Sequence, residues 1–419
     1  MIKIKTLPTL DAFVRIPGSK SLTQRAMVVA ALAEGESLLR NVLVSEDTLA
    51  LADALRSFNV DIRQDGTDMV VRGVGGAVSG TSDPIYLGNN GTALRLLTGV
   101  ASLGKGPFTL TGDRRLCERP LKPLLDALGE LGVACDTNEN RGYPPVTIRG
   151  GRLRGGSIVL RDIPSSQFVS SLLIAAPYAS GDIEIVLEGN IPSLPYIALT
   201  IETMEAFGVS VYQEDRRYRI KGKQCYHGRE HGIEGDASSA SYFFLAAALT
   251  KGRVRVGNIA RKTRQGDIGF LSILEDLGCQ IYCGDNFIEV RGGELPGGDM
   301  TFDLGEMPDI VPTLAVLCAM RPGQSTIRNV AHLRLKESDR IAALAAELQK
   351  TGISAGELPD GLIINGGHPH GARIKTYNDH RIAMGFAIMG LCVPSIEIEN
   401  EACIGKSFPG FLKVLGELY

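Results

Sequence analysis

The stretch "IPGSKSLTQRAMVVAALAEG", residues 16–35, decides the fold, because a polar turn leads into a helix that is apolar on most sides. Ser21 and Gln24 match a capping box, in which a hydroxyl and an amide satisfy backbone N–H groups at the start of a helix. The pattern predicts a helix over about 22–33, ended by Gly35. A helix that is apolar almost all round is buried rather than amphipathic.

Lys20 and Arg25 stand at the start of this predicted helix. A helix start already carries free N–H groups and the positive end of the helix dipole, so two further cations there favour a bound anion. A lysine in a solvated turn is the alternative for Lys20.

Five more helices of the same kind follow along the chain, each rich in alanine and leucine and each with a polar first turn. The six start points lie near Ser21, Gly91, Ser166, Ser238, Asp309 and Asp379, at spacings of 70, 75, 72, 71 and 70 residues. A regular spacing of this kind indicates a repeated architecture.

A second series has the same period. Segments such as "LGELGV" and "LEDLGC" place a small turn residue next to last, and a strand, a polar turn and a second strand follow it. The turn residues are Asn59, Gly132, Gly208, Gly278 and Gly352. The sixth copy, "FLKVLGELY", stops before its strands, and the N-terminal "MIKIKTL" is the candidate to supply the missing one.

Each repeat therefore contains a buried helix, an outer helix and several strands, and is too small to cover its own apolar surface. Three repeats around each of two cores fit the usual size of a domain. If the buried helices of a domain lie parallel, their N-termini meet on one face. We expect two such faces to oppose each other across a cleft that binds anions.

Composition limits the possible functions. The chain has 419 residues, 44% of them hydrophobic, and a net charge of −3, which disfavours a broad nucleic-acid surface. No apolar run has transmembrane length, and no signal-peptide core follows Met1, so no membrane partner and a cytoplasmic location are expected. The eight cysteines lack paired zinc spacing and are expected to be reduced.

One metal motif needs separate treatment. His227, Glu230 and His231 match the pattern H-x-x-E-H. That pattern requires a helix, whereas Gly228 and Gly232 interrupt this short polar segment, so no metal site is expected.

Two carboxylates, Asp309 and Glu337, stand in segments that otherwise carry arginine and lysine. In a cationic cleft such a carboxylate is a candidate general acid or base. Taken singly, a serine or aspartate at a helix start is more often only a cap. The recurrence at one period favours the functional interpretation.

Seven motifs together resemble the EPSP synthase family of enolpyruvyl transferases, in the family's order and over essentially the whole chain. They are "PGSKSLTQR", "LGNNGTALR", "ERPLKPL", "EGDASSASYF", "MPDIVPTLAV", "LKESDR" and "NDHRIAM". The resemblance implies an α/β fold, the two-domain inside-out α/β barrel, with six βαβαββ-type repeats, three per domain. The first domain would comprise 1–18 and 235–419 and the second 19–234, with the active site in the interdomain cleft. Asn90 departs from the family pattern, where alanine is common.

The resemblance also implies the reaction. The enolpyruvyl group of phosphoenolpyruvate would move to the 5-hydroxyl of shikimate 3-phosphate by addition and elimination, releasing phosphate, in the shikimate pathway to chorismate and the aromatic amino acids. No cofactor is implied. Both substrates carry phosphate and carboxylate groups, which fits the cationic helix starts. A monomer is expected.

Roles carry over residue by residue. The catalytic residues implied are Lys20, Asp309, Glu337 and His380. Those implied for shikimate 3-phosphate are Lys20, Ser21, Arg25, Ser165, Ser166, Gln167, Ser193, Tyr196, Asp309 and Lys336. Those implied for phosphoenolpyruvate are Lys20, Gly91, Arg119, Gln167, Arg340, Arg381 and Lys406. The division of proton transfer among Lys20, Asp309 and Glu337 stays open, because coupled groups in one site exchange protons.

Two other functions remain as alternatives. A UDP-N-acetylglucosamine 1-carboxyvinyltransferase has a related fold, but that family carries a cysteine five residues before the arginine of its Arg-Pro pair, where this chain has Arg114. A non-catalytic protein that binds phosphorylated ligands would have little use for Asp309 and Glu337, which repel anions.

Overall fold

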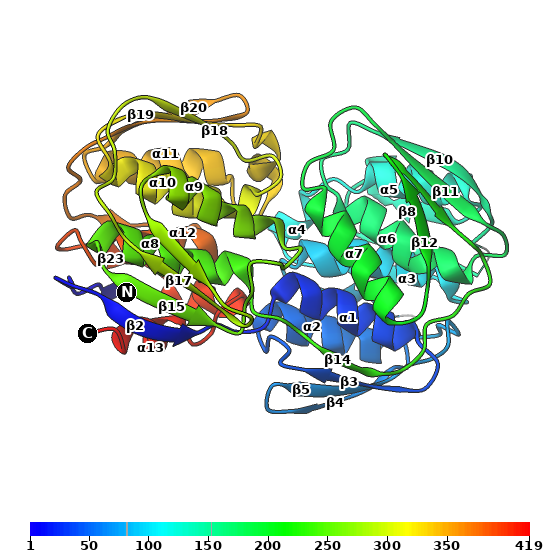
Figure 1. The fold of residues 1–419 in the computed structure, drawn as a ribbon. Coiled ribbons are helices and arrows are strands. Elements are labelled where there is room, and N and C mark those ends of the chain that lie inside the picture. Colours follow the sequence, from blue (N-terminus) through cyan, green and yellow to red (C-terminus); the bar gives the residue numbers. More distant parts are fainter. Residues whose placement is uncertain (81–82, 152) are drawn as a thin grey trace. The chain divides into compact units, whose positions relative to one another are not determined.

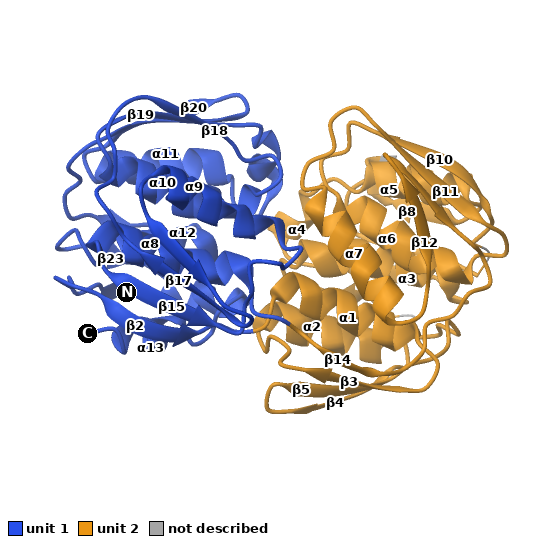
Figure 2. Ribbon diagram, in the orientation of Figure 1, with its two compact units in different colours: residues 1–17, 234–419 blue, residues 18–233 orange. Residues whose placement is uncertain are grey.

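The chain folds into two compact units, each with its own apolar core (Figure 2). The computed structural model describes residues 1–80, 83–151 and 153–419. Unit 1 comprises Met1–Pro17 and Glu234–Tyr419, and unit 2 is the continuous segment Gly18–Ile233. Within each unit the helices lie inside and small sheets cover the outside (Figure 1). The architecture is mixed α/β, as the sequence predicts.

Three buried helices form the centre of each unit. In unit 2 they are α1 (Lys20–Leu32), α3 (Gly91–Leu103) and α6 (Gln167–Ala175), and in unit 1 they are α8 (Ala237–Thr250), α10 (Val311–Met320) and α12 (His380–Met389). Every residue of α12 is buried. Small residues such as Ala and Gly allow these helices to pack closely, and Gly99 of α3 lies against the backbone of Ser171 in α6.

A second set of helices packs around the first. It comprises α2 (Glu46–Arg56), α5 (Lys122–Glu130), α7 (Pro195–Ala206), α9 (Phe270–Asp276), α11 (Arg340–Lys350) and α13 (Phe411–Gly416), and one short helix, α4 (Arg114–Cys117), stands apart from the repeat. The predicted turn residues after five of them all have positive φ, from +63° at Asn59 to +92° at Gly208. That prediction is confirmed, since glycine and asparagine adopt this conformation most easily.

The strands of the described ranges form six small sheets. Those of unit 2 use β3 (Glu36–Arg40), β4 (Asp61–Asp65), β5 (Asp68–Arg72), β6 (Ile85–Tyr86), β7 (Phe108–Thr111), β8 (Ala134–Thr137), β9 (Val146–Arg149), β10 (Gly156–Arg161), β11 (Ile183–Glu188), β12 (Val211–Glu214), β13 (Arg217–Ile220) and β14 (Glu230–Gly232). Those of unit 1 use β1 (Ile2–Lys3), β2 (Asp11–Arg15), β15 (Arg253–Gly257), β16 (Gln280–Cys283), β17 (Phe287–Arg291), β18 (Met300–Asp303), β19 (Gly323–Arg328), β20 (Ser354–Leu358), β21 (Gly361–Gly366), β22 (Arg373–Ile374) and β23 (Glu397–Ile398).

One repeat shows the common topology. In the order β10, α6, β11, α7, β12, β13, the first two strands are parallel, joined through the buried helix, and β13 pairs antiparallel with both β11 and β12. A crossover helix is the usual link between parallel strands. This βαβαββ order agrees with the predicted repeat.

Two repeats borrow their first strand from a distant part of the chain. The parallel partner of β3 is β14, from the end of unit 2, and the parallel partner of β15 is β2, which precedes unit 2 in sequence. The last repeat borrows as well, because β1 pairs antiparallel with β23, Ile2 opposite Ile398. The N-terminal segment therefore supplies the strand that the sixth repeat lacks, as predicted.

The predicted capping box at the first helix is wrong. Helix α1 begins at Lys20, its N-cap is Ser19, and no side chain caps it. Ser21 lies in the first turn and Gln24 is fully buried in the helix. The helix ends at Leu32, three positions before Gly35, whose φ is +88°.

The helices described here do not include one that is both long enough and apolar enough to cross a membrane. All eight cysteines are free thiols.

Candidate active site

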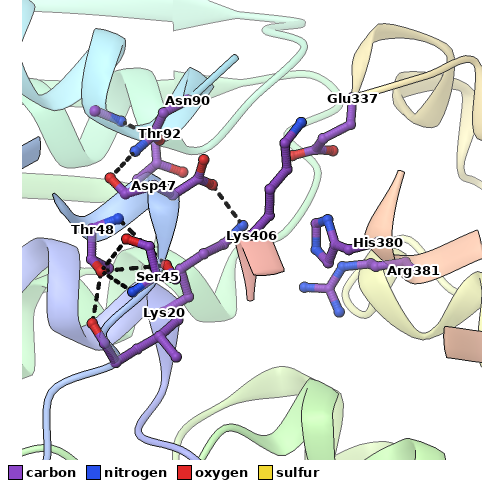
Figure 3. Close-up of polar contacts among 12 residues, drawn as sticks. Lys20, Ser45, Asp47, Thr48, Asn90, Thr92, Glu337, His380, Arg381 and Lys406 are labelled. Atoms are coloured by element: carbon purple, nitrogen blue, oxygen red, sulfur yellow. Dashed lines mark hydrogen bonds and ion pairs between the residues drawn. The ribbon is translucent and has the colours of Figure 1, made fainter. Parts of the chain in front are cut away.

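Lys20 is held at the start of α1 by an ion pair. Its Nζ donates to Oδ2 of Asp47 at 3.0 Å, and both side chains are largely buried. Asp47 lies in the first turn of α2, and its carbonyl accepts a hydrogen bond of 2.8 Å from Nδ2 of Asn90, the N-cap of α3 (Figure 3). Asn90, which departs from the family pattern, thereby joins the starts of α1, α2 and α3.

Arg25 is a buried cation with neutral partners. Its side chain is 1% exposed and donates to the hydroxyl of Thr200 at 2.8 Å and to the carbonyl of Ser21 at 3.0 Å. The ring of Tyr196 lies 5.6 Å from its guanidinium carbon. Within the residues that the structure describes, no carboxylate forms an ion pair with it. Burial accordingly lowers the pKa of Arg25 to about 10.

Gly91 lies beneath two arginines at the start of α3. A Cβ atom placed on Gly91 would overlap Nη1 of both Arg95 and Arg119. Arg95 donates to the carbonyl of Gly91 at 3.0 Å and to Oε1 of Gln167 at 3.3 Å, and Gln167 in turn donates to the hydroxyl of Thr92 at 2.9 Å. The absence of a side chain at Gly91 is what allows both guanidinium groups to approach the helix start.

The remaining unit 2 residues predicted for the site lie near the starts of α6 and α7. Ser166 is the N-cap of α6, and the hydroxyl of Ser165 accepts from the backbone N–H of Gln167 at 3.3 Å. Ser193 is buried with a φ of +62° in the turn before α7, and Tyr196 is the second residue of that helix. The structure therefore brings the starts of α1, α3 and α6 together through side-chain contacts.

Arg340 binds three carboxylates in unit 1. It donates to Oδ1 of Asp309 at 2.9 Å, to Oε2 of Glu337 at 2.8 Å and to Oδ2 of Asp379 at 2.8 Å. The second oxygen of Asp309 accepts from Arg381 at 2.7 Å. Asp309 thus bridges two buried arginines, one on α11 and one on α12.

These contacts fix the charge of the cluster. Burial alone would raise the pKa of the Asp309 carboxyl, but Arg381, Lys336 and Arg340 lower it well below its usual range. Burial alone would lower the pKa of Arg340, yet Asp379, Glu337 and Asp309 raise it above its ordinary value. Asp309 and Arg340 are therefore both ionised.

The start of α12 carries two of the predicted site residues, His380 and Arg381, and their neighbour Asp379. Asp379 is the N-cap and accepts from the backbone N–H of Arg381 at 3.0 Å, and His380 is fully buried as the first residue of the helix (Figure 3). Lys406, at the end of the short helix η6 (Glu401–Lys406), lies 3.5 Å from the carbonyl of Asn378. Lys336 and Glu337 precede α11 and are half-buried.

The sequence analysis missed three residues of this arrangement. Asp47 holds Lys20 and Thr200 holds Arg25, as described above. Asp267, in the short helix η3 (Gly266–Gly269), is buried and accepts a short hydrogen bond from the hydroxyl of Ser238 on α8. Asp47 could have been found as an acid in the first turn of a helix. No sequence signal that we can name marks Asp267.

The surroundings of Asp267 favour its neutral, protonated form. Burial raises its pKa from the ordinary 3.8 to about 7, and the nearby charge of Asp309 adds to the effect, while Arg381 and the Ser238 hydroxyl oppose it. Its Oδ1 atom is buried and has no hydrogen-bond partner among the described residues.

The pH dependence of stability should reveal this carboxyl. The folded protein binds the Asp267 proton more tightly than the unfolded chain does, so stability present below pH ~4 is lost as the pH rises toward 7, at up to about 1.4 kcal/mol per pH unit. Asp267→Asn keeps the side chain neutral. The melting temperature of the variant minus that of the starting protein should therefore increase as the pH is raised from 5 to 8, as measured by calorimetry. A constant difference across that range would contradict the assignment.

Comparison with known proteins identifies the family. The model of the EPSP synthase (3-phosphoshikimate 1-carboxyvinyltransferase) family matches residues 4–415. The 3-phosphoshikimate 1-carboxyvinyltransferase of Methanothermobacter thermautotrophicus is 43% identical over 403 residues, covering 96% of this chain and 94% of that protein. The same enzyme of Syntrophobacter fumaroxidans is 43% identical over 420 residues, covering 99% of each.

A solved structure agrees in fold. The EPSP synthase from Acinetobacter baumannii superposes with a TM-score of 0.82 at 28% sequence identity, covering 99% of this chain and 97% of that one. The match confirms the predicted fold class. With two carboxylates and a set of buried arginines at the helix starts of a sixfold-repeated α/β fold, the chain belongs to the EPSP synthase family of 3-phosphoshikimate 1-carboxyvinyltransferases.

Proposed function

We propose that this chain transfers the enolpyruvyl group of phosphoenolpyruvate to the 5-hydroxyl of shikimate 3-phosphate through the residues described above. The observation that carries the proposal is Arg25, a fully buried guanidinium that no carboxylate pairs with in the described ranges. Burying an ion without a counterion is costly. A bound phosphate or carboxylate would offset that cost, because charge-assisted hydrogen bonds to a guanidinium are among the strongest in proteins.

The resemblance assigns shikimate 3-phosphate to one set of residues. Arg25, Tyr196 and the hydroxyls near the starts of α6 and α7 would bind its phosphate and ring, and Asp309 and Lys336 its hydroxyl side. The full set is Lys20, Ser21, Arg25, Ser165, Ser166, Gln167, Ser193, Tyr196, Asp309 and Lys336. Buried hydroxyls next to an arginine support this assignment, since they accept or donate as the ligand requires.

Phosphoenolpyruvate is assigned to the remaining cations. By the resemblance, its ligands are Lys20, Gly91, Arg119, Gln167, Arg340, Arg381 and Lys406. Arginine pairs with phosphate and carboxylate through two parallel hydrogen bonds, which fixes the orientation of a small anion.

The chemistry needs a proton at C3 of phosphoenolpyruvate and a base for the acceptor hydroxyl. In the addition step the hydroxyl oxygen bonds to C2, its proton passes to Asp309, and C3 is protonated by Glu337 or Lys20. In the elimination step C3 gives up a proton, the double bond re-forms, and the C2–O bond to phosphate breaks. His380 is assigned a supporting part, because it begins the helix that carries Arg381.

Asp309 is a weak base while Arg381 and Arg340 both bind it. The phosphate and carboxylate of phosphoenolpyruvate would compete for the same guanidinium groups. Losing part of that attraction raises the proton affinity of Asp309. In this proposal substrate binding itself turns a structural carboxylate into a usable base.

We also propose that the chain acts as a cytoplasmic monomer without a nucleic-acid or membrane partner. The net charge of −3 supports the lack of a nucleic-acid partner. Light scattering in solution tests the monomer against a chain mass of 44.8 kDa.

The choice of acceptor separates this function from its alternatives. Phosphate released from phosphoenolpyruvate should appear with shikimate 3-phosphate and not with UDP-N-acetylglucosamine. Release with the nucleotide sugar alone would favour the related transferase, and release with neither would favour a binding protein.

Arg25→Gln tests the carrying observation. Because no described carboxylate pairs with Arg25, its removal should leave the melting temperature nearly unchanged while the KM for shikimate 3-phosphate rises at least tenfold, equivalent to about 1.4 kcal/mol of binding. Steady-state kinetics and calorimetry measure both quantities.

Arg321→Gln is the matched control for Arg25→Gln. Arg321 is also buried, but it donates to the carbonyls of Pro296 and Gly298 and to the hydroxyl of Ser325 in unit 1. Its loss should lower the melting temperature and leave KM unchanged. A stability loss at Arg25 equal to that at Arg321, with no change in KM, would mark Arg25 as structural.

Glu337→Gln separates binding from chemistry. The amide keeps the shape of the carboxylate beside Arg340 but removes its proton-transfer ability, so kcat should fall by roughly 10²- to 10⁴-fold with small changes in KM. Glu357→Gln is the control, because Glu357 pairs with Arg334 on the surface, and its substitution should change neither kcat nor KM. Near-normal turnover of Glu337→Gln would remove Glu337 from the mechanism.

A further inference from the structure

Outside the residues assigned to the reaction, Glu34, Cys225 and His227 form a cluster of metal-ligand side chains in unit 2. One ligand atom from each lies within 4.8 Å of the other two. The Sγ atom of Cys225 is 3.8 Å from Nε2 of His227, and Oε2 of Glu34 is 4.0 Å from Nδ1 of the same ring. No other trio of His, Cys, Asp or Glu among the described residues meets this spacing.

The backbone fixes the two segments that carry the ligands. The N–H of Glu34 donates to the carbonyl of Tyr226 at 2.8 Å, and the N–H of Gly228 donates to the carbonyl of Glu34 at 2.8 Å. The N–H of His227 also donates to the carbonyl of Phe207 at 3.0 Å. The cluster therefore joins the end of α1 to the segment that returns to β14, and the main chain holds it before any ligand binds.

Tyr178 packs beneath the cluster and ties it to the core. Its hydroxyl donates a short hydrogen bond to the carbonyl of Leu32, the last residue of α1, and accepts from the N–H of Tyr226 at 3.2 Å. The Tyr178 ring also packs edge to face, at 5.8 Å, against the ring of Tyr226, the residue between Cys225 and His227.

The donor atoms select the kind of metal. A thiolate, an imidazole and a carboxylate together suit Zn²⁺, whereas Mg²⁺ and Ca²⁺ take oxygen ligands. A tetrahedral Zn²⁺ with ordinary bond lengths separates such ligands by about 3.4 to 3.6 Å. Because Cys225 faces Nε2 of His227 and Glu34 faces Nδ1, an ion bound to one ring nitrogen requires a side chain to rotate. The ligand atoms start within 4.8 Å of one another, and the side chains of Glu34 and His227 are 63% and 64% exposed and so can rotate inward.

We propose that Glu34, Cys225 and His227 bind one Zn²⁺ ion, with water in the fourth position. The two anionic ligands balance the charge of the ion. The ion fastens the returning segment 225–232 to the connection between α1 and β3 and so stabilises unit 2. None of the three residues is assigned to either substrate or to proton transfer.

This set differs from the H-x-x-E-H pattern in the sequence. Of that pattern, Glu230 pairs with Arg40, and the His231 ring packs against Phe207 at 5.5 Å. Only His227 is shared. Glu34 lies 191 positions before Cys225 in sequence, and the fold alone brings it to the other two ligands.

Metal titration of the full chain tests the proposal. Zn²⁺ alone should bind in a 1:1 ratio by calorimetry under reducing conditions and raise the melting temperature. Co²⁺ in its place should give a thiolate-to-cobalt charge-transfer absorption in the near ultraviolet. Cys225→Ser and His227→Gln should each weaken Zn²⁺ binding at least tenfold and abolish that absorption, without changing the rate of phosphate release.

Matched controls distinguish the site from general thiol and imidazole binding. Cys283 and His370 are exposed residues of unit 1, and Cys283→Ser and His370→Gln should bind Zn²⁺ as the starting protein does. The proposal is overturned if the starting protein binds no Zn²⁺, or if Cys225→Ser and His227→Gln weaken binding less than tenfold or no more than the controls do.

Discussion

A repeat that cannot cover its own apolar helix is the constraint on which this structure depends. Each βαβαββ repeat presents a helix that is buried on nearly every side, so three repeats must share one core. Sharing a core brings three helix starts together in unit 2, where Asp47 links Lys20 to Asn90 and Gln167 contacts Thr92 and Arg95 of α3. Polar residues at those starts follow from the packing, because each start leaves backbone N–H groups that need partners.

The two units use their helix starts differently. Unit 2 presents cations, and the partners of its most buried one, Arg25, among the described residues are hydroxyls, a carbonyl and a ring. Unit 1 compensates its arginines internally, with Arg340 holding Asp309, Glu337 and Asp379 in fixed positions. The positive charge at the helix starts of unit 2 is thus suited to binding an anion. The paired arginines and carboxylates of unit 1 are suited to proton transfer.

The sequence predicted the repeat, the turn residues after the outer helices and the borrowed N-terminal strand, because these follow from periodicity and from the preference of glycine and asparagine for turns. It failed at the cap of α1. The Ser21–Gln24 pattern predicted a capping box, but the helix begins earlier, at Lys20, and has no side-chain cap. It also missed Thr200 and Asp267, since both act through partners from other elements, and Asp47, although an acid in the first turn of a helix is a recognisable signal. The roles of the catalytic residues rest on resemblance. The contacts of each residue within its own unit show which substitutions can test those roles.

The borrowed strands have a consequence for the order of folding during synthesis. Unit 2 is one continuous segment, so the ribosome delivers all of its strands by Ile233. Unit 1 must wait, because β2 pairs with β15 across 242 positions and β1 with β23 near the far end of the chain. Contacts so distant in sequence form slowly. Until they form, β1 and β2 lack their partner strands, whereas every strand of unit 2 has already been synthesised.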